Sequence, residues 1–529
     1  MKAFFSIVKL TLRNVFRSHV FRLLFALLVL CVIFVPASIE GDGTARGFIQ
    51  VSLKFSLFSV ALMLALSSVW SSCMAMTQDV EGYQLHMVIT KPVSRVTIWL
   101  AKATGIFCVH ALLLLVASVL VYTAVITRYN AQVTPPEELD RINGRVAELA
   151  AEVEQMPNTK ERDVRQHRLN ELREEQRQIR LALEEDRRIR NEVLVARRRF
   201  VPVGTVFDET IQQTVQLPIS SKRYVNARAR SKFRELLADN QKQGIVWDTG
   251  TQQARLAEMN VAVTVEESQI KYGERKSWKI AGLPALTDRP LYLRFRTFVT
   301  QVSDHTERYT FGQWFYSRVT TREDGVTVAD PNNWVPLTSS PQQYRTNQFA
   351  TLELPANLVD SEGTVFVSFI NYDPDGEDMF FQIFDGPHIY VPFGGFTANY
   401  FKNVLVIMLA LAILCGLSCA AGGVLSMPTA IFVVVTYIMF GVFADIVIHY
   451  DFISGIGDVI AQKVGHVVLL GVVPLQNFDV STDVADGIMV EWAFIGKLFL
   501  QDLIFRGVPL FLLGIYLYRR REMGLVIRK

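Results

Sequence analysis

Two pairs of residues in the apolar parts of the chain carry groups that could do chemistry. Asp502 and Arg506 lie four residues apart, as do Cys415 and Cys419. This spacing places both members of a pair on one helix face, so the first pair can form an ion pair and the second could bind a soft metal ion. Packing or anchoring at the membrane interface also explains the charged pair, and close helix packing also explains the cysteines. Neither pair by itself indicates a reaction.

The motifs of common enzyme classes are missing from the sequence. No apolar stretch combines Ser with His, paired Asp residues or His-Glu-x-x-His, so an intramembrane enzyme is the least favoured function. Gly496-Lys497 lacks the upstream glycine and the following hydroxyl residue of a phosphate-binding loop. We expect no catalytic residue, no metal site and no cofactor bound by this chain. Any ATP-driven work would need a second polypeptide.

Composition divides the 529 residues into membrane and non-membrane parts. Half of the residues are hydrophobic, and two apolar blocks flank a long polar insert that carries most of the charge. The net charge of +3 averages over these unlike regions, so it predicts no nucleic-acid partner. All five cysteines fall in apolar stretches, and the insert must therefore fold without disulfides.

Uncharged stretches of suitable length predict six transmembrane helices. The first span follows Arg22, the second covers 55–76 and the third covers 103–127. The stretch 404–444 is divided into two spans at the small residues before Pro428, and the sixth span covers about 499–518. Lys and Arg concentrate in the short connections that lie on the same side of the membrane as the N-terminus. This bias places both termini in the cytoplasm and the insert outside. A signal peptide cleaved near Pro36-Ala37-Ser38 is the competing interpretation of the first span. The charge bias favours six spans.

The insert is expected to contain a helical hairpin and a β-sandwich. Apolar residues alternate in steps of three and four from Leu139 to Met156 and resume at Leu169, with Pro157-Asn158 between the two arms. From Phe200 the pattern changes to short alternating runs separated by turn residues, which is typical of a jelly-roll-like sandwich. One helical piece is expected near 227–237. Four tryptophans could stack on sugars or fill the core: Trp247, Trp278, Trp314 and Trp334.

The predicted organisation is therefore a membrane α-helical bundle with an extracytoplasmic α+β insert. Its expected parts are an amphipathic interfacial helix at 1–22, spans one to three at 23–127 with a cytoplasmic loop at 77–102, the hairpin at 135–198, the all-β sandwich at 200–396, spans four to six at 400–518 with an extracytoplasmic broken-helix segment at 451–490, and a basic cytoplasmic tail at 519–529.

The cytoplasmic loop is the most informative connection. Leu85, Val88 and Ile89 can line one face of a short helix that Pro92 ends. Such a helix suits docking into a groove on a cytoplasmic partner, although an interfacial connector without a partner has the same pattern.

An acidic residue, a short helix, the run Lys91-Pro92-Val93-Ser94-Arg95 and then Lys102 resemble the cytoplasmic loop of type-two ABC exporter permeases. The similarity is greatest to the branch linked to multicopper-enzyme maturation and gliding motility, and it extends to the six-span layout and the basic tail. In that family this loop is a coupling helix seated in the ATPase subunit. The resemblance implies that the ATPase contacts lie at Glu81, Gly82, Tyr83, Leu85, Val88 and Ile89, and that Pro92 and Arg95 fix the entry into span three.

This resemblance implies a function and a set of partners. The chain would be the permease of an ATP-driven exporter in a bacterial inner membrane, working as a homodimer or related heterodimer with cytoplasmic ABC ATPases that bind ATP and Mg. Its periplasmic domain would receive cargo or engage an envelope protein or glycan, and no motif selects among substrates. The alternative is a non-transporting membrane receptor or scaffold whose sandwich binds glycan or protein. Copurification of an ATPase separates the two.

Overall fold

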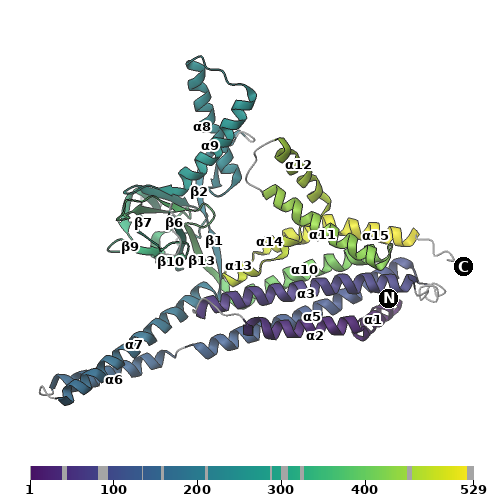
Figure 1. Cartoon of the computed structure of the whole chain (residues 1–529), viewed down its shortest axis with the longest axis horizontal. Coiled ribbons are helices and arrows are strands. Elements are labelled where there is room, and N and C mark those ends of the chain that lie inside the picture. Colours follow the sequence, from purple (N-terminus) through teal and green to yellow (C-terminus); the bar gives the residue numbers. More distant parts are fainter. Residues whose placement is uncertain are drawn as a thin grey trace. The chain divides into compact units, whose positions relative to one another are not determined.

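The structure is a computed structural model that describes residues 2–38, 45–81, 93–133, 135–155, 160–208, 212–285, 289–299, 308–321, 327–449 and 456–520. The chain forms two compact units, one comprising Met1–Ala196 with Gly394–Lys529 and the other Arg197–Phe393. The first unit is helical, and the second is rich in β-structure (Figure 1).

Long apolar helices dominate the first unit and indicate a membrane protein. Within the described residues, five helical segments are long and apolar enough to cross a membrane: α3 (Ala45–Glu81), α5 (Arg95–Gln132), α10 (Phe396–Gly422), α11 (Met427–His449) and the segment Trp492–Arg520. The segment Trp492–Arg520 comprises α14 (Trp492–Lys497), a π-helix labelled η3 (Leu498–Gly507) and α15 (Val508–Arg520).

Two further apolar segments are bent rather than straight. The expected surface helix and first span correspond to α1 (Lys2–Arg17) and α2 (His19–Ser38), which meet at 69° around Ser18. A second bend of 60° separates α12 (Ile456–Gly471) from η2 (Leu475–Phe478) and α13 (Ser481–Ala485). This second bend lies inside the segment for which broken helices were predicted.

The predicted division of the 404–444 stretch is confirmed. Helix α10 ends at Gly422, and α11 begins at Met427 with Pro428 in its first turn. Proline is tolerated in the first turn because the N–H groups there have no partner within the helix.

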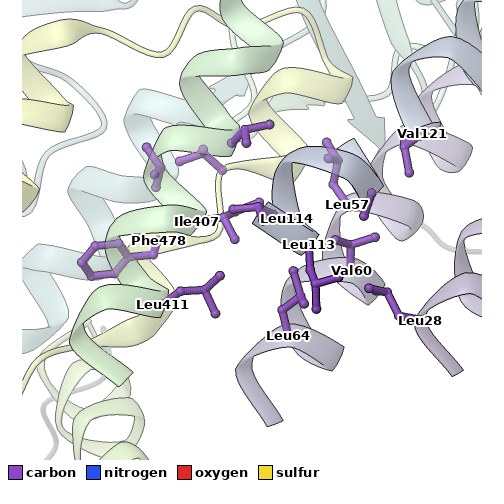
Figure 2. Close-up of a cluster of buried hydrophobic side chains, with 14 of the residues drawn as sticks. Leu28, Leu57, Val60, Leu64, Leu113, Leu114, Val121, Ile407, Leu411 and Phe478 are labelled. Atoms are coloured by element: carbon purple, nitrogen blue, oxygen red, sulfur yellow. The ribbon is translucent and has the colours of Figure 1, made fainter. Parts of the chain in front are cut away.

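Leu57 and Leu64 of α3, Leu113 and Leu114 of α5, and Ile407 of α10 belong to one buried cluster. Figure 2 shows Leu114 and Ile407 side by side within it. Hydrogen bonds from Trp99 to the Cys419 carbonyl and from Tyr400 to the Ser118 carbonyl fix α5 and α10 as antiparallel neighbours.

The predicted helical hairpin is present as α6 (Pro136–Gln155) and α7 (Lys160–Glu192), which lie side by side (Figure 1). The Gln176 side chain, at a core position of the heptad pattern, donates to the Asn143 amide oxygen over 2.6 Å. At about 1.5 Å per residue the arms measure about 30 and 50 Å. The expected turn at Pro157-Asn158 lies outside the described residues.

Two antiparallel sheets form the second unit. The first has the strand order β1-β13-β6-β12-β4, with β10 also paired to β6; its strands are β1 (Val195–Phe200), β4 (Gln269–Ile270), β6 (Leu291–Val299), β10 (Phe349–Leu354), β12 (Met379–Phe381) and β13 (His388–Gly395). The second has the order β3-β2-β5-β11-β7-β8, with β9 paired to β7; its strands are β2 (Pro202–Asp208), β3 (Gln213–Pro218), β5 (Arg275–Ile280), β7 (Tyr309–Thr321), β8 (Thr327–Pro336), β9 (Gln342–Arg345) and β11 (Val365–Asn371).

Both sheets contribute to one aromatic core. Phe295 of β6 and Phe381 of β12 come from the first sheet, and Trp314 of β7 and Phe369 of β11 from the second. The ring centroids of Phe295 and Trp314 lie 4.8 Å apart, and those of Phe369 and Phe381 lie 5.3 Å apart. Alternating runs around these residues were therefore correctly interpreted as strands with one buried face.

The helical piece expected near 227–237 is present, but it is longer than expected and a second helix follows it. The structure has two helices of similar length, α8 (Lys222–Lys242) and α9 (Thr249–Ser268), which lie side by side (Figure 1). Ser221 and Asp248 cap their N-termini by accepting backbone N–H groups. The second helix was missed because its apolar residues are few and its Val and Thr content is typical of strands.

Replacing Phe381 by Ala should destabilise the second unit, because the core would lose a ring that touches both sheets. We expect a loss of about 3–5 kcal/mol in the free energy of unfolding. Urea unfolding of the full chain in detergent, followed by tryptophan fluorescence, measures it. Phe384→Ala is the matched control, since Phe384 is 64% exposed and Phe381 only 2%. Equal effects of the two changes would contradict this account of the core.

Candidate functional site

The start of α5 is the point where the cytoplasmic loop of the sequence analysis joins the helical unit. Ser94 has an extended backbone, and its hydroxyl accepts the Thr97 N–H over 3.1 Å. This N-cap ends the connection and fixes the first helical residue as Arg95.

Three side chains in the first two turns of α5 donate hydrogen bonds to the carbonyls of other helices. The bonds are Arg95 Nη1 to Arg519 O (2.9 Å), Trp99 Nε1 to Cys419 O (3.3 Å) and Lys102 Nζ to Ala75 O (2.9 Å). The acceptors belong to α15, α10 and α3, respectively. We call these three donors the α5 entry cluster. It connects the helix that follows the loop to three other helices.

The chemistry of the acceptors explains the residue types of the α5 entry cluster. The Arg519 carbonyl lies in the last turn of α15, where backbone carbonyls lack a partner within the helix. The Cys419 carbonyl lies in the last turn of α10, where it also accepts the Gly423 N–H. The negative end of a helix also attracts cations. Trp99 is buried and supplies an N–H without adding a charge. Arg95 instead lies at an exposed position, where its charge remains hydrated.

Most of the predicted ATPase contacts lie outside the described residues: Gly82, Tyr83, Leu85, Val88, Ile89 and Pro92. Glu81 is the last residue of α3. Arg95 is described and belongs to the α5 entry cluster. Trp99 was not singled out by the sequence analysis. Its spacing of four from Arg95 and three from Lys102, which places the three on one face, is the signal that could have identified it.

The predicted Asp502–Arg506 ion pair is present. Both residues lie in the π-helical segment, and the Asp502 carboxylate is almost completely buried at 3% exposure. Pairing lowers the cost of placing either charge in an apolar environment. A π-helix of this length is unusual, and such segments often occur at functional positions.

The bent segment after α12 is held by polar side chains from α10 and α11. Tyr437 of α11 donates to the Gly471 carbonyl over 3.1 Å and accepts the Val473 N–H over 3.0 Å. Asn399 of α10 donates to the Ile488 carbonyl and accepts the Val490 N–H, each over 2.7 Å. The chain leaves helical geometry here, and these contacts supply the partners that its backbone groups need.

The cysteines of α10 serve close packing. Cys415 and Cys419 are buried, and a Cβ at Gly422 of the same helix would lie 3.0 Å from Cys73 Cα of α3. A Cβ at Gly416 would overlap the Phe511 ring. The described residues contain no group of three or more His, Cys, Asp or Glu side chains arranged to hold a metal ion. Close packing against α3 and Phe511 accounts for the glycines at positions 422 and 416.

The four tryptophans of the insert have different environments. Trp278 and Trp314 are buried in the shared core, where they cannot stack on a ligand. Trp247 stacks on Phe233 of α8 with centroids 6.4 Å apart, and Trp334 lies 5.7 Å from the Arg275 guanidinium. Packing is thus the role of the first two, as expected, and the other two are partly exposed.

A basic and aromatic layer covers the other face of the first sheet. The Arg294 guanidinium lies 4.1 Å from the Phe349 ring centroid, and Arg197 lies 4.9 Å from that of Tyr390. His388, directly opposite Arg294 in the strand register, is buried. Burial, together with the charges of Arg199 and Arg294, lowers the pKa of His388 to about 3. His388 is therefore neutral at ordinary pH.

Comparison of the chain with protein-family models, with curated proteins and with solved structures finds no match. The functional argument therefore depends on the residues and geometry described above.

Acidification should destabilise the second unit through His388. The folded state binds a proton on this ring only near pH 3, whereas the unfolded chain does so near pH 6.5. The unfolded state therefore holds more protons between these values, and the free energy of unfolding should fall by up to about 1.4 kcal/mol per pH unit as the pH drops through that window. Above the window this residue should contribute no pH dependence.

Urea midpoints of the full chain between pH 7 and 5 measure this effect. His388→Leu should flatten the profile, and His167→Leu should leave it unchanged, because His167 lies on an exposed face of α7. Identical slopes for the wild type and His388→Leu would show that other groups cause the acid sensitivity.

Proposed function

We propose that the chain is the membrane-spanning permease subunit of an ATP-driven ABC exporter in the bacterial inner membrane. In this proposal six spans are formed by α2, α3, α5, α10, α11 and the segment Trp492–Arg520, with both termini in the cytoplasm. The second unit would be a periplasmic sandwich of jelly-roll type. Two permeases, identical or related, would work with two cytoplasmic ATPases that bind ATP and Mg.

The observation that supports this proposal most directly is the α5 entry cluster. A coupling loop can move a helical bundle only if its downstream helix is fixed to other helices. Arg95, Trp99 and Lys102 provide such connections to α15, α10 and α3. Closure of an ATPase against residues 81–89 would then displace the ends of four helices together, as a switch between two packed arrangements requires.

Further features agree with the proposal. The bend between α1 and α2 suits a surface helix that leads into a span, and the bend after α12 suits half-helices at the outer side of a bundle. The helical hairpin and the sandwich would extend into the periplasm, where they would receive cargo or engage an envelope protein or glycan.

An ATPase should accompany the full chain when it is purified in mild detergent from its native membranes. We expect the eluate to contain a protein with a phosphate-binding loop and to hydrolyse ATP. Tyr83→Ala should reduce the recovered ATPase, because it removes a predicted contact of the loop. Tyr272→Ala is the matched control, since Tyr272 is exposed in the second unit. Recovery of the chain without any ATPase would favour the receptor or scaffold function instead.

Loss of one hydrogen bond in the α5 entry cluster should separate ATPase binding from coupling. Trp99→Phe keeps an aromatic side chain, although a smaller one than the indole, and removes the donor to the Cys419 carbonyl, whose hydrogen bond should contribute about 1 kcal/mol. We expect normal recovery of the ATPase but a smaller effect of the permease on its rate of ATP hydrolysis. Trp70→Phe, on a partly exposed face of α3, is the control. An unchanged rate in Trp99→Phe would remove the entry cluster from the coupling path.

The side of the membrane on which the loop lies can be tested independently. A cysteine at Tyr83 should resist an impermeant thiol reagent applied from the periplasm, and one at Tyr272 should react. The unsubstituted protein is the reference, because its five cysteines lie in apolar segments. Labelling of Tyr83→Cys under these conditions would reverse the proposed topology.

A further inference from the structure

A row of three polar side chains crosses the first sheet on the face that points away from the core. Arg294 of β6 lies directly opposite Thr351 of β10 on one side and His388 of β13 on the other. Residues opposite each other in antiparallel strands share a face, with Cβ atoms about 5 Å apart. The adjacent Leu293 and Ile389 belong to the core, so the row occupies the other face. We call Thr351, Arg294 and His388 the polar row.

Each member of the polar row carries a buried polar atom that forms no hydrogen bond with any described residue. These atoms are Thr351 Oγ1, Arg294 Nε and His388 Nε2. Arg294 and His388 are only 6% and 4% exposed. Buried polar atoms in folded proteins nearly always have a partner, and leaving one without a partner costs free energy. Three such atoms in one row therefore indicate a position that binds a ligand.

The positive charge of Arg294 is not balanced by a carboxylate of the described residues. Their ion pairs do not include Arg294, whereas Arg296, two residues further along the same face of β6, pairs with Asp385. The Arg294 guanidinium instead lies 4.1 Å from the Phe349 ring centroid and 5.8 Å from that of Tyr390. The rings orient the cation without supplying a negative charge. Because a buried cation without an anion is costly, the row favours an anionic ligand.

The donors of the polar row suit a carboxylate. A guanidinium can donate two parallel N–H groups, here from Nε and a terminal nitrogen, to the two oxygens of one carboxylate. The Thr351 hydroxyl can donate a further bond, and so can Nε2 of the neutral His388 ring in one of its tautomers. The row supplies one cation, which matches one negative charge. Arg199, the second cation that acts on His388, is exposed.

The edge of the first sheet gives a ligand access to the polar row. Strand β10 is paired with β6 and with no other described strand, and Thr351 of β10 is only partly buried. Phe349, whose ring covers Arg294, is 40% exposed and lies outside the core, so it can turn aside. Glu353 of the same strand lies opposite Tyr292 rather than Arg294 and is exposed.

We propose that the polar row binds the carboxylate group of a ligand, with Arg294 supplying the charge and Thr351 and His388 further hydrogen bonds. This site would give the second unit a chemical class of ligand, namely carboxylic acids. The inference does not depend on the proposed ATPase or on any transport activity.

Urea unfolding of the full chain in detergent at pH 7 tests this proposal, with the fluorescence of the buried Trp278 and Trp314 as the signal. Acetate or glucuronate replaces chloride at constant ionic strength. A ligand that binds only the folded state raises its stability as the ligand concentration rises, and this dependence gives the dissociation constant. We expect both acids to raise the urea midpoint of the wild type. Arg294→Met should weaken their binding at least tenfold, and Thr351→Val about fivefold.

Arg296→Gln is the matched control, because it removes a cation of the same face that already has a carboxylate partner. It should keep the response to acetate. Arg294→Lys keeps the charge without the planar pair of donors and should retain part of the response. Size-exclusion profiles identify variants that fail to fold. If Arg294→Met is among them, the nearly isosteric Thr351→Val provides the test.

Three results would overturn the proposal. Equal responses of the wild type and Arg294→Met to acetate would show a general salt effect. An unchanged dissociation constant in Thr351→Val would remove the polar row from binding. A stronger response of the wild type to phosphate than to acetate would contradict the assignment to a carboxylate.

Discussion

Backbone groups at a helix end or a helix break inside a membrane must find their hydrogen-bond partners within the protein, and several polar side chains of the helical unit bond to backbone groups of other helices. Arg95, Trp99 and Lys102 donate to carbonyls of α15, α10 and α3. Tyr437 and Asn399 each supply one donor and one acceptor to the irregular chain after α12. Side-chain hydrogen bonds to backbone groups therefore join helices that lie far apart in the sequence.

The apolar contacts between the helices depend on small side chains as much as on large ones. Lipid tails are as apolar as leucine, so helices gain little from hydrophobic burial against each other, and close approach becomes important. Gly422 lets α10 approach Cys73 of α3, and Gly416 leaves room for Phe511. An apolar hollow between α2 and α5 is the opposite case, because the small side chains of Ala117 and Ala124 line it.

Much of the architecture could be predicted from the sequence because its patterns have simple physical causes. Uncharged length identified α3, α5, α10 and α11, and the heptad pattern identified both arms of the α6–α7 hairpin. Local patterns cannot, however, give the partner of a side chain that comes from a distant segment. The spacing of Trp99 from Arg95 and Lys102 places it on their helix face, but only the position of Cys419 identifies the acceptor of its N–H. Local patterns also do not give strand pairing, because β12 and β13 follow each other in the chain but both pair with β6 rather than with each other.

The Gln176–Asn143 hydrogen bond fixes how the two arms of the helical hairpin are aligned along each other. Leucines repeated every heptad would pack equally well if one arm were shifted by seven residues. An amide pair, in contrast, has only one alignment in which both of its side chains are hydrogen-bonded. The two arms therefore have a single stagger. The distance that the hairpin spans is thus set by the number of heptads in its two arms.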